Sequence, residues 1–201
     1  SSVVIPNSMQ CEALKNLESQ RKRGVDKSLL ISATGTGKTF LSAFDVQASG
    51  AQKVLFVVHR ANITQKAMES FKRIFGDQKT MGLYSGKSRE KEADFLFSTV
   101  QTINREEHLK QFSKDYFDYI IIDETHRAGA KTYQRILDHF SPKFILGMTA
   151  TPERTDGYDI FSLFDCPLLA MNANFGYIKK LYLLFFIGVS IFKPVIGNNL
   201  K

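Results

Sequence analysis

Short apolar runs alternate with amphipathic stretches along most of the chain. The apolar runs are each five or six residues long and are bounded by polar residues or glycine, which predicts strands at 28–32, 54–59, 80–84, 95–99, 119–123 and 144–149. Between them, apolar residues recur at helical spacing, as at Ile63, Ala67, Phe71 and Ile74. This predicts helices over 38–47, 62–75, 106–112 and 132–140. Such alternation is typical of an α/β fold with a mostly parallel sheet and helices on both faces.

The length of 201 residues favours a single domain, predicted here over residues 1–169. After Leu169 the character of the sequence changes, and 170–201 is expected to be a tail. The tail could be a further packed strand or helix, a partner interface or a poorly ordered end; packing ranks first, because an apolar run left in water is a liability. Its longest apolar run, 181–192, has 12 residues, against the roughly 18 to 20 that span a bilayer, so no membrane segment is expected.

Composition adds an indication of the partner. The net charge of +7 and the pI near 9.4 suit a partner made of phosphates, although charge alone is a weak indication and says nothing about fold. Cys11 and Cys166 match no metal-ligand or redox spacing. No signal peptide is recognisable, so a cytoplasmic location is expected.

A candidate phosphate-binding loop, SATGTGKT at 32–39, follows a predicted strand and opens a predicted helix. Glycines allow successive N–H groups to point inward, and the helix N-terminus adds a positive dipole, so Thr34, Gly35, Thr36 and Gly37 are expected to cradle a polyphosphate. Lys38 supplies a mobile cation for the outer phosphates, and the Thr39 hydroxyl is placed to ligate Mg²⁺. The general pattern begins with Gly, where this chain has Ser32. The alternative is a glycine-rich turn without a ligand.

Two consecutive carboxylates, Asp123 and Glu124, follow the strand predicted at 119–123. The C-terminal ends of parallel strands face the crevice where ligands bind, and the phosphate loop lies at the same edge. Asp123 is expected to hold Mg²⁺, and Glu124 to orient and deprotonate the attacking water. Read alone, the pair is as often a polar strand end; together with the phosphate loop it indicates a hydrolytic centre.

These motifs together resemble those of superfamily 2 helicases. The resemblance covers roughly 5–164 and rests on three ordered segments, ATGTGKT at 33–39, DETH at 123–126 and TATPERTDG at 149–157. It is nearest to the DEAH-like branch that includes the motor subunits of type I and type III restriction enzymes. It implies a three-layer RecA-like P-loop NTPase domain that uses ATP and Mg²⁺.

The resemblance also implies roles for residues outside the phosphate loop. Gln10 matches the adenine-recognition glutamine, whose carboxamide offers a donor and an acceptor side by side. Three loops are expected to hold a nucleic-acid backbone without reading its sequence, through Arg60, Ser85, Gly86, Thr99 and Gln101. Arg60 could equally be an ordinary salt-bridging arginine. His126, Thr149 and Thr151 are implied to couple the nucleotide site to nucleic-acid binding.

An intact motor of this kind has a second RecA-like domain that carries an arginine reaching the γ-phosphate. No such motif follows Asp165, and 32 residues from 170 to 201 are fewer than the 50 or so that a domain needs. The resemblance implies nucleic acid as a partner, with DNA favoured over RNA only by the restriction-like style of the motifs, and the missing arginine implies a second RecA-like domain or partner subunit. The leading hypothesis is an ATP-driven helicase or translocase; the alternative is a binding module that does not turn over.

Overall fold

The computed structural model describes residues 3–32, 35–123, 130–150, 164 and 166–171. Seven strands form one sheet: β1 (Lys27–Ser32), β2 (Val54–Val58), β3 (Met81–Tyr84), β4 (Phe95–Thr99), β5 (Tyr119–Asp123), β6 (Phe144–Thr149) and β7 (Cys166–Met171). Their order across the sheet is β3-β4-β2-β5-β6-β1-β7, and every neighbouring pair is parallel. All strands therefore end at the same edge, which is called the C-terminal edge below.

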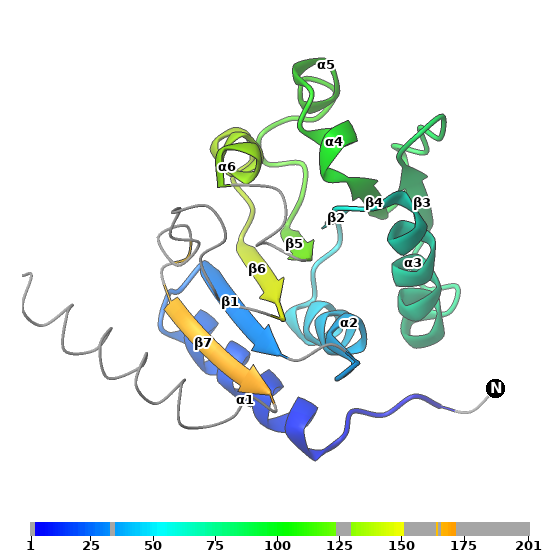
Figure 1. Ribbon diagram of the computed structural model, residues 1–201. Helices are drawn as coiled ribbons and strands as arrows, with labels where there is room; N and C mark the ends of the chain where they lie inside the picture. The colour runs from blue at the N-terminus through cyan, green and yellow to red at the C-terminus, as the bar shows by residue number, and fades with distance from the viewer. Residues whose placement is uncertain (1–2, 33–34, 124–129, 151–163, 165, 172–201) are drawn as a thin grey trace, which may run out of the picture.

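Helices cover both faces of this sheet (Figure 1). They are α1 (Ser8–Lys22), α2 (Lys38–Ser49), α3 (Ala61–Phe75), α4 (Val100–Ile103), α5 (Glu106–Leu109) and α6 (Ala130–His139). One core lies between the sheet and α1, α2 and α3, and the other lies between the sheet and α4, α5 and α6. The result is the predicted three-layer α/β fold. None of the helices in the described part of the chain is long and apolar enough to cross a membrane.

The continuous apolar runs follow from burial on both faces. In β2 all five residues are buried; Val54, Phe56 and Val58 pack into the first core, whereas Leu55 and Val57 pack into the second. Successive side chains of a strand point to opposite faces, so a strand between two helical layers has no polar face. The six predicted strands are present with bounds within one residue, and the sheet, predicted as mostly parallel, is parallel throughout its described pairs.

Three elements were not predicted: α1, α4 and β7. The last strand pairs with β1 and carries the sheet to Met171, past the expected domain boundary at 169. Residues 172–201, the rest of the expected tail, lie outside the described residues.

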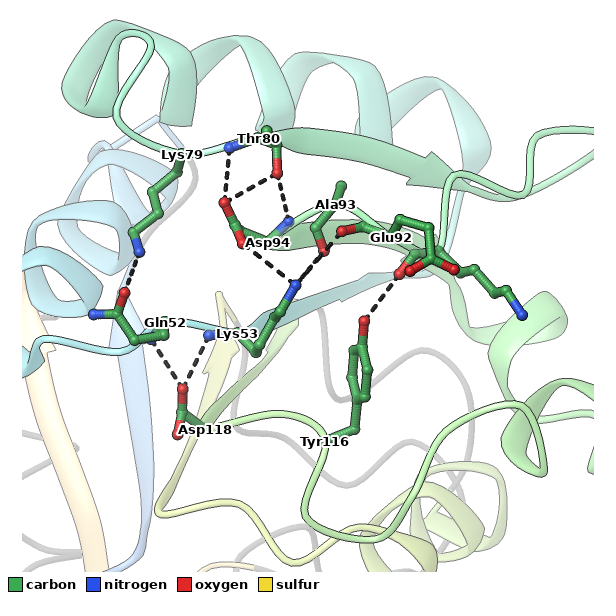
Figure 2. Close-up of polar contacts among 10 residues, drawn as sticks. Gln52, Lys53, Lys79, Thr80, Glu92, Ala93, Asp94, Tyr116 and Asp118 are labelled. Carbon is green, nitrogen blue, oxygen red and sulfur yellow. Dashed lines mark hydrogen bonds and ion pairs between the residues drawn. The ribbon is translucent and has the colours of Figure 1, made fainter.

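A polar network joins the strand starts at the opposite, N-terminal edge (Figure 2). Asp118 precedes β5, and its Oδ2 accepts the backbone N–H groups of Gln52 (2.9 Å) and Lys53 (3.0 Å) just before β2. The Lys53 ammonium lies 3.3 Å from a carboxylate oxygen of Asp94, which precedes β4. Asp94 in turn accepts the N–H (3.1 Å) and hydroxyl (3.0 Å) of Thr80 before β3. These contacts fix where the strands begin relative to one another.

A buried ionic cluster ties two helices to the sheet. Arg21 of α1 donates to both carboxylate oxygens of Asp45 of α2, at 2.6 and 2.8 Å, and Asp45 is fully buried. The Tyr119 hydroxyl of β5 donates to the same carboxylate at 2.5 Å. Burial first, and then the Asp45 carboxylate, raise the pKa of Tyr119 well above its ordinary value, so its phenol stays protonated. Three hydrogen bonds to the Asp45 carboxylate offset the free-energy cost of burying its charge.

Candidate nucleotide and nucleic-acid site

Three of the predicted motifs meet at the C-terminal edge, on neighbouring strands. β1 leads into the phosphate loop, β5 ends at Asp123, and β6, which lies between them, ends at Thr149. The register pairs Asp123 with Met148, and Thr149 with Ile31. The sheet order therefore places Thr149 between the phosphate loop and the carboxylate, at a depth where Thr149 is fully buried and Asp123 is 8% exposed.

The described part of the phosphate loop has the geometry of an anion cradle. Gly35 and Gly37 both have φ near +80°, a region that favours glycine. Gly37 is the N-cap of α2 and offers no side-chain hydrogen bond to the helix, and the first turn has no acidic residue. No side chain therefore caps the start of α2, and the positive end of its helix dipole favours an anion there. At the loop's other end, the buried Ser32 hydroxyl is hydrogen-bonded to the hydroxyl of Thr36.

The oxygen donors expected for Mg²⁺ belong to two elements at this edge. Thr39 is the second residue of α2 and is partly buried, and Asp123 is the last residue of β5. A hydroxyl and a carboxylate are the hard oxygen ligands that Mg²⁺ prefers, and Mg²⁺ usually takes only one or two protein ligands beside phosphate oxygens and water. The donor set therefore fits Mg²⁺ held against a nucleotide. Among the described residues no group of three or more His, Cys, Asp or Glu side chains gathers to hold a metal.

Gln10 contacts the phosphate loop directly. Its Nε2 donates to the Gly37 carbonyl at 3.3 Å, and its Oε1 accepts the Asn7 N–H at 3.0 Å. Asn7 Oδ1 accepts the Gln10 N–H at 2.9 Å, which completes a capping box at the start of α1. A carboxamide has two donor and two acceptor positions, so these two contacts use one donor and one acceptor of Gln10. The contact also leaves little room for a side chain at position 37, because a Cβ on Gly37 would lie 2.9 Å from Gln10 Nε2.

The predicted nucleic-acid residues follow β2, β3 and β4 at the same edge. Arg60 is exposed and is the N-cap of α3; the neighbouring His59 Nδ1 lies 3.5 Å from Nε2 of the exposed Gln101. Ser85 and Gly86 directly follow β3; Ser85 is buried, whereas Gly86 is exposed with φ +56°.

Thr99 is buried, and its hydroxyl is engaged within the protein. It accepts the Thr102 N–H at 3.3 Å as the N-cap of α4 and is also hydrogen-bonded to the Thr102 hydroxyl at 2.9 Å. Four further predicted site residues lie outside the described residues: Thr34, Glu124, His126 and Thr151.

Sequence reasoning did not single out His59, Arg89 or His108 as site residues. His59 lies in a loop that it did identify, but nothing in the sequence pairs it with Gln101, 42 positions away. Arg89 and His108 come together with Tyr84 beside Gly86, a contact that no motif encodes.

The fold and this edge define a RecA-like P-loop domain of the α/β class. A profile of the family described as "Type III restriction enzyme, res subunit" matches residues 4–154. The chain belongs to this family of helicase and restriction-motor ATPase domains, which confirms the resemblance to superfamily 2.

Individual relatives agree with this assignment. A type I restriction enzyme EcoAI endonuclease subunit of Escherichia coli is 28% identical over 85% of this chain and 22% of its own length. The putative ATP-dependent helicase IRC3 of Saccharomyces cerevisiae is 30% identical over 73% of the chain and 23% of its length. The chain thus spans about a quarter or less of the length of these relatives.

Solved structures support the fold. The UvsW helicase of bacteriophage T4 superposes with a TM-score of 0.69 at 16% identity, over 84% of this chain and 61% of that one. The type ISP restriction-modification enzyme LlaGI, solved with a DNA substrate mimic, has a TM-score of 0.64 at 20% identity, over 95% and 23% respectively.

Proposed function

We propose that this chain is the ATP-binding motor domain of a nucleic-acid-dependent ATPase of the helicase or translocase type. The observation that supports this most is the convergence at one sheet edge of an uncapped glycine-flanked helix start, a strand-end carboxylate and a buried threonine between them. None of these features is required by the packing of a sheet, whereas each has a use in binding and hydrolysing a nucleoside triphosphate.

The proposed chemistry follows from this arrangement. The N–H groups at the start of α2 and the Lys38 ammonium bind the phosphates, and Gln10 takes the adenine edge with its remaining donor and acceptor. Thr39 and Asp123 hold Mg²⁺, which when bound neutralises charge on the phosphate oxygens. Glu124, next in the chain after Asp123, takes the proton of the attacking water.

Coupling to nucleic acid is proposed to run through the strand ends. The burial of Thr149 beside both the strand that leads into the phosphate loop and β5 supports a role in which its hydroxyl responds when the γ-phosphate leaves. Thr151 and His126 join the same relay by resemblance. Arg60, Gln101 and the loop at Ser85 and Gly86 hold the nucleic-acid backbone; DNA is favoured over RNA because the motifs resemble those of restriction motors.

Removal of the Lys38 ammonium tests the nucleotide site. We expect Lys38→Ala to weaken binding of a non-hydrolysable Mg-ATP analogue by at least about tenfold, because an ion pair with phosphate is lost, while the melting temperature stays close to that of the parent chain. The matched control is Lys15→Ala, an exposed lysine on α1 with the same change in charge. Isothermal titration calorimetry measures the affinity; equal affinities for both variants would contradict the assignment.

Exchange of the proposed base tests hydrolysis. In a chain that turns over ATP, Glu124→Gln should keep nucleotide affinity and lose hydrolysis, because the amide preserves shape but accepts no proton. Steady-state phosphate release at the parent rate would show that another group activates the water.

A further inference from the structure

The residues that follow β3 fold back on that edge strand as a compact return loop, defined here as residues 85–90. The Glu90 N–H donates to the Leu83 carbonyl at 3.2 Å, and its carboxylate accepts the Leu83 N–H at 2.6 Å. Gly82 makes room for this return, since a Cβ there would lie 2.8 Å from both the Cβ and the carbonyl oxygen of Glu90. The far end of the loop is thereby fixed to the sheet.

Arg89 fixes the exposed turn of the return loop. Its Nη1 donates to the carbonyls of Gly86 and Ser88, both at 2.7 Å. The guanidinium carbon lies 5.3 Å from the centroid of the Tyr84 ring, within the range of a cation–π contact. One long side chain thus binds two carbonyls of an exposed turn. Because arginine is flexible, holding it in this conformation costs conformational entropy, which a contact that orients the guanidinium reduces.

His108 of α5 supplies that alignment. Its Nδ1 lies 3.0 Å from the Tyr84 hydroxyl, and its Nε2 lies 3.5 Å from Arg89 Nη2. The Tyr84 and His108 rings meet edge to face, with centroids 5.5 Å apart, and Tyr84 is only 2% exposed. We call Tyr84, Arg89 and His108 the latch.

The latch requires a neutral histidine. A guanidinium can only donate, so the contact with Arg89 uses Nε2 as acceptor, and the ring proton then lies on Nδ1 and is donated to the Tyr84 oxygen. A second proton on Nε2 removes the acceptor and places a cation beside Arg89. Glu107 Oε1, 3.6 Å from Nε2, would then attract the imidazolium away from the guanidinium.

We propose that Arg89 and His108 are positioning residues that hold the return loop ready for a nucleic-acid backbone, and that protonation of His108 releases the loop. The inference rests on the proposed function, in which Ser85 and Gly86 contact that backbone. A preset loop loses less conformational entropy on binding, so the latch strengthens binding without touching the ligand.

The charges around His108 set the pH range of the release. Burial first, and then the cations of Arg89 and Arg105, lower the pKa of His108, while Glu107 opposes them. Tyr84 stays neutral, because burial raises its pKa. The latch is therefore closed at neutral pH and opens on the acid side of about 6.5, the ordinary histidine value.

Nuclear magnetic resonance of the 201-residue chain tests the latch without nucleic acid. The amide signals of Gly86 and Ser88 should shift between pH 8 and 5 with the midpoint of the His108 ring, and His108→Gln, which takes up no proton, should abolish that shift. His139→Gln removes another histidine and should leave it unchanged. If the amide signals of Gly86 and Ser88 do not shift, or shift with a midpoint that differs from that of the His108 ring, the latch is wrong.

Binding of a mixed-sequence single-stranded oligonucleotide at pH 8 tests the function of the latch. Tyr84→Phe, His108→Phe and His108→Gln should each weaken binding about fivefold, the size of one lost neutral hydrogen bond, without changing the slope of log K against log salt. His139→Phe is the control, and unchanged nucleotide affinity shows that each variant is folded.

The outcomes separate the two proposals. Unchanged oligonucleotide affinity in the His108 variants, with a loss only in Arg89→Gln, would mean that Arg89 acts without alignment by His108, and the inference would fall. If the parent chain shows no salt-dependent binding, the proposed nucleic-acid function fails, and with it the positioning role, while the titration of Gly86 and Ser88 still decides whether the latch exists.

Discussion

Gly147 lies within β6, two residues before Thr149, against the ring of Phe164. A Cβ at Gly147 would come within 2.3 Å of Phe164 Cζ, far inside van der Waals contact, and Phe164 is buried. An alanine here would force the ring or the strand to move, and overpacking of this kind costs about 1 to 3 kcal/mol. We therefore expect Gly147→Ala to lower the free energy of unfolding by that amount, as measured by urea denaturation.

The companion variant identifies the cause. Phe164→Leu in the Gly147→Ala background should recover part of the loss, so that the two changes are non-additive. If the changes in unfolding free energy of the two substitutions simply add, the Phe164 ring is not the reason that position 147 excludes a side chain. Gly50→Ala is a useful comparison, because Gly50 has φ +70° and nothing within 4 Å of a Cβ, so that its effect reports backbone strain alone.

A local motif is the easiest source of predictions for single residues. The order of residues in 35–39 predicts a turn that needs glycine, and Gly35 and Gly37 both have φ near +80°; the roles of Lys38 and Thr39 stay predictions. The contacts of Gln10 with Gly37 and of Phe164 with Gly147 were not predictable, because they join residues 27 and 17 positions apart through the packing of the sheet.

At the scale of elements, the polar network at the N-terminal edge is a source of pH-dependent stability. Burial raises the pKa of Asp118, but the N–H groups of Lys53 and Gln52 and the Lys143 ammonium outweigh it, so that its pKa lies below the ordinary value. A carboxylate with a depressed pKa stabilises the fold fully at pH values above its pKa in the unfolded chain, which is near 3.9. This stabilisation is lost as the pH falls through the lower pKa of the folded state.

Asp118→Asn tests this contribution. At pH 7 the variant should be less stable than the parent by about 1.5 to 3 kcal/mol, the range for hydrogen bonds to a charged group. The difference should shrink below pH 4 as the parent carboxylate takes up a proton. Urea denaturation at both pH values measures it. The exposed Asp77→Asn is the control, and a difference that persists unchanged at pH 3 would contradict the role of ionisation.

Strands buried on both faces were the easiest elements to predict, because each is a short continuous apolar run without the helical spacing of apolar residues. The four-residue α4 is too short for helical periodicity and is specified by its Thr99 cap. β7 contains Pro167, which argues against a strand, yet as an edge strand it tolerates the missing N–H. Asp45 within α2 would have been taken for a surface residue, since only the fold brings Arg21 and Tyr119 to it.

At the scale of the whole molecule, the two proposed activities occupy different halves of one edge. The nucleotide motifs follow β1, β6 and β5, and the proposed nucleic-acid loops follow β2, β4 and β3. β5 and β2 are paired neighbours, so the boundary between the halves lies at Asp123 and the residues after Val58. We propose that a change at the nucleotide reaches the nucleic-acid loops through these adjacent strand ends, without deformation of the sheet.

Turnover tests whether this domain works alone. Stabilisation of charge on the γ-phosphate by an arginine gives about 10³ to 10⁵ in rate in comparable NTPases, and by resemblance that arginine is proposed to come from a second RecA-like domain. If that arginine reaches the site only when a second domain closes on it, we expect the 201-residue chain to bind Mg-ATP but to hydrolyse it very slowly, with little stimulation by DNA. Addition of a second domain, as a covalent extension or a separate chain, should raise DNA-stimulated phosphate release by orders of magnitude.

The Lys38→Ala variant is the control for a contaminating ATPase, because activity that belongs to this chain should be lost in it. Robust DNA-stimulated hydrolysis by the chain alone, abolished by Lys38→Ala, would mean that a second copy supplies the arginine or that the domain needs none.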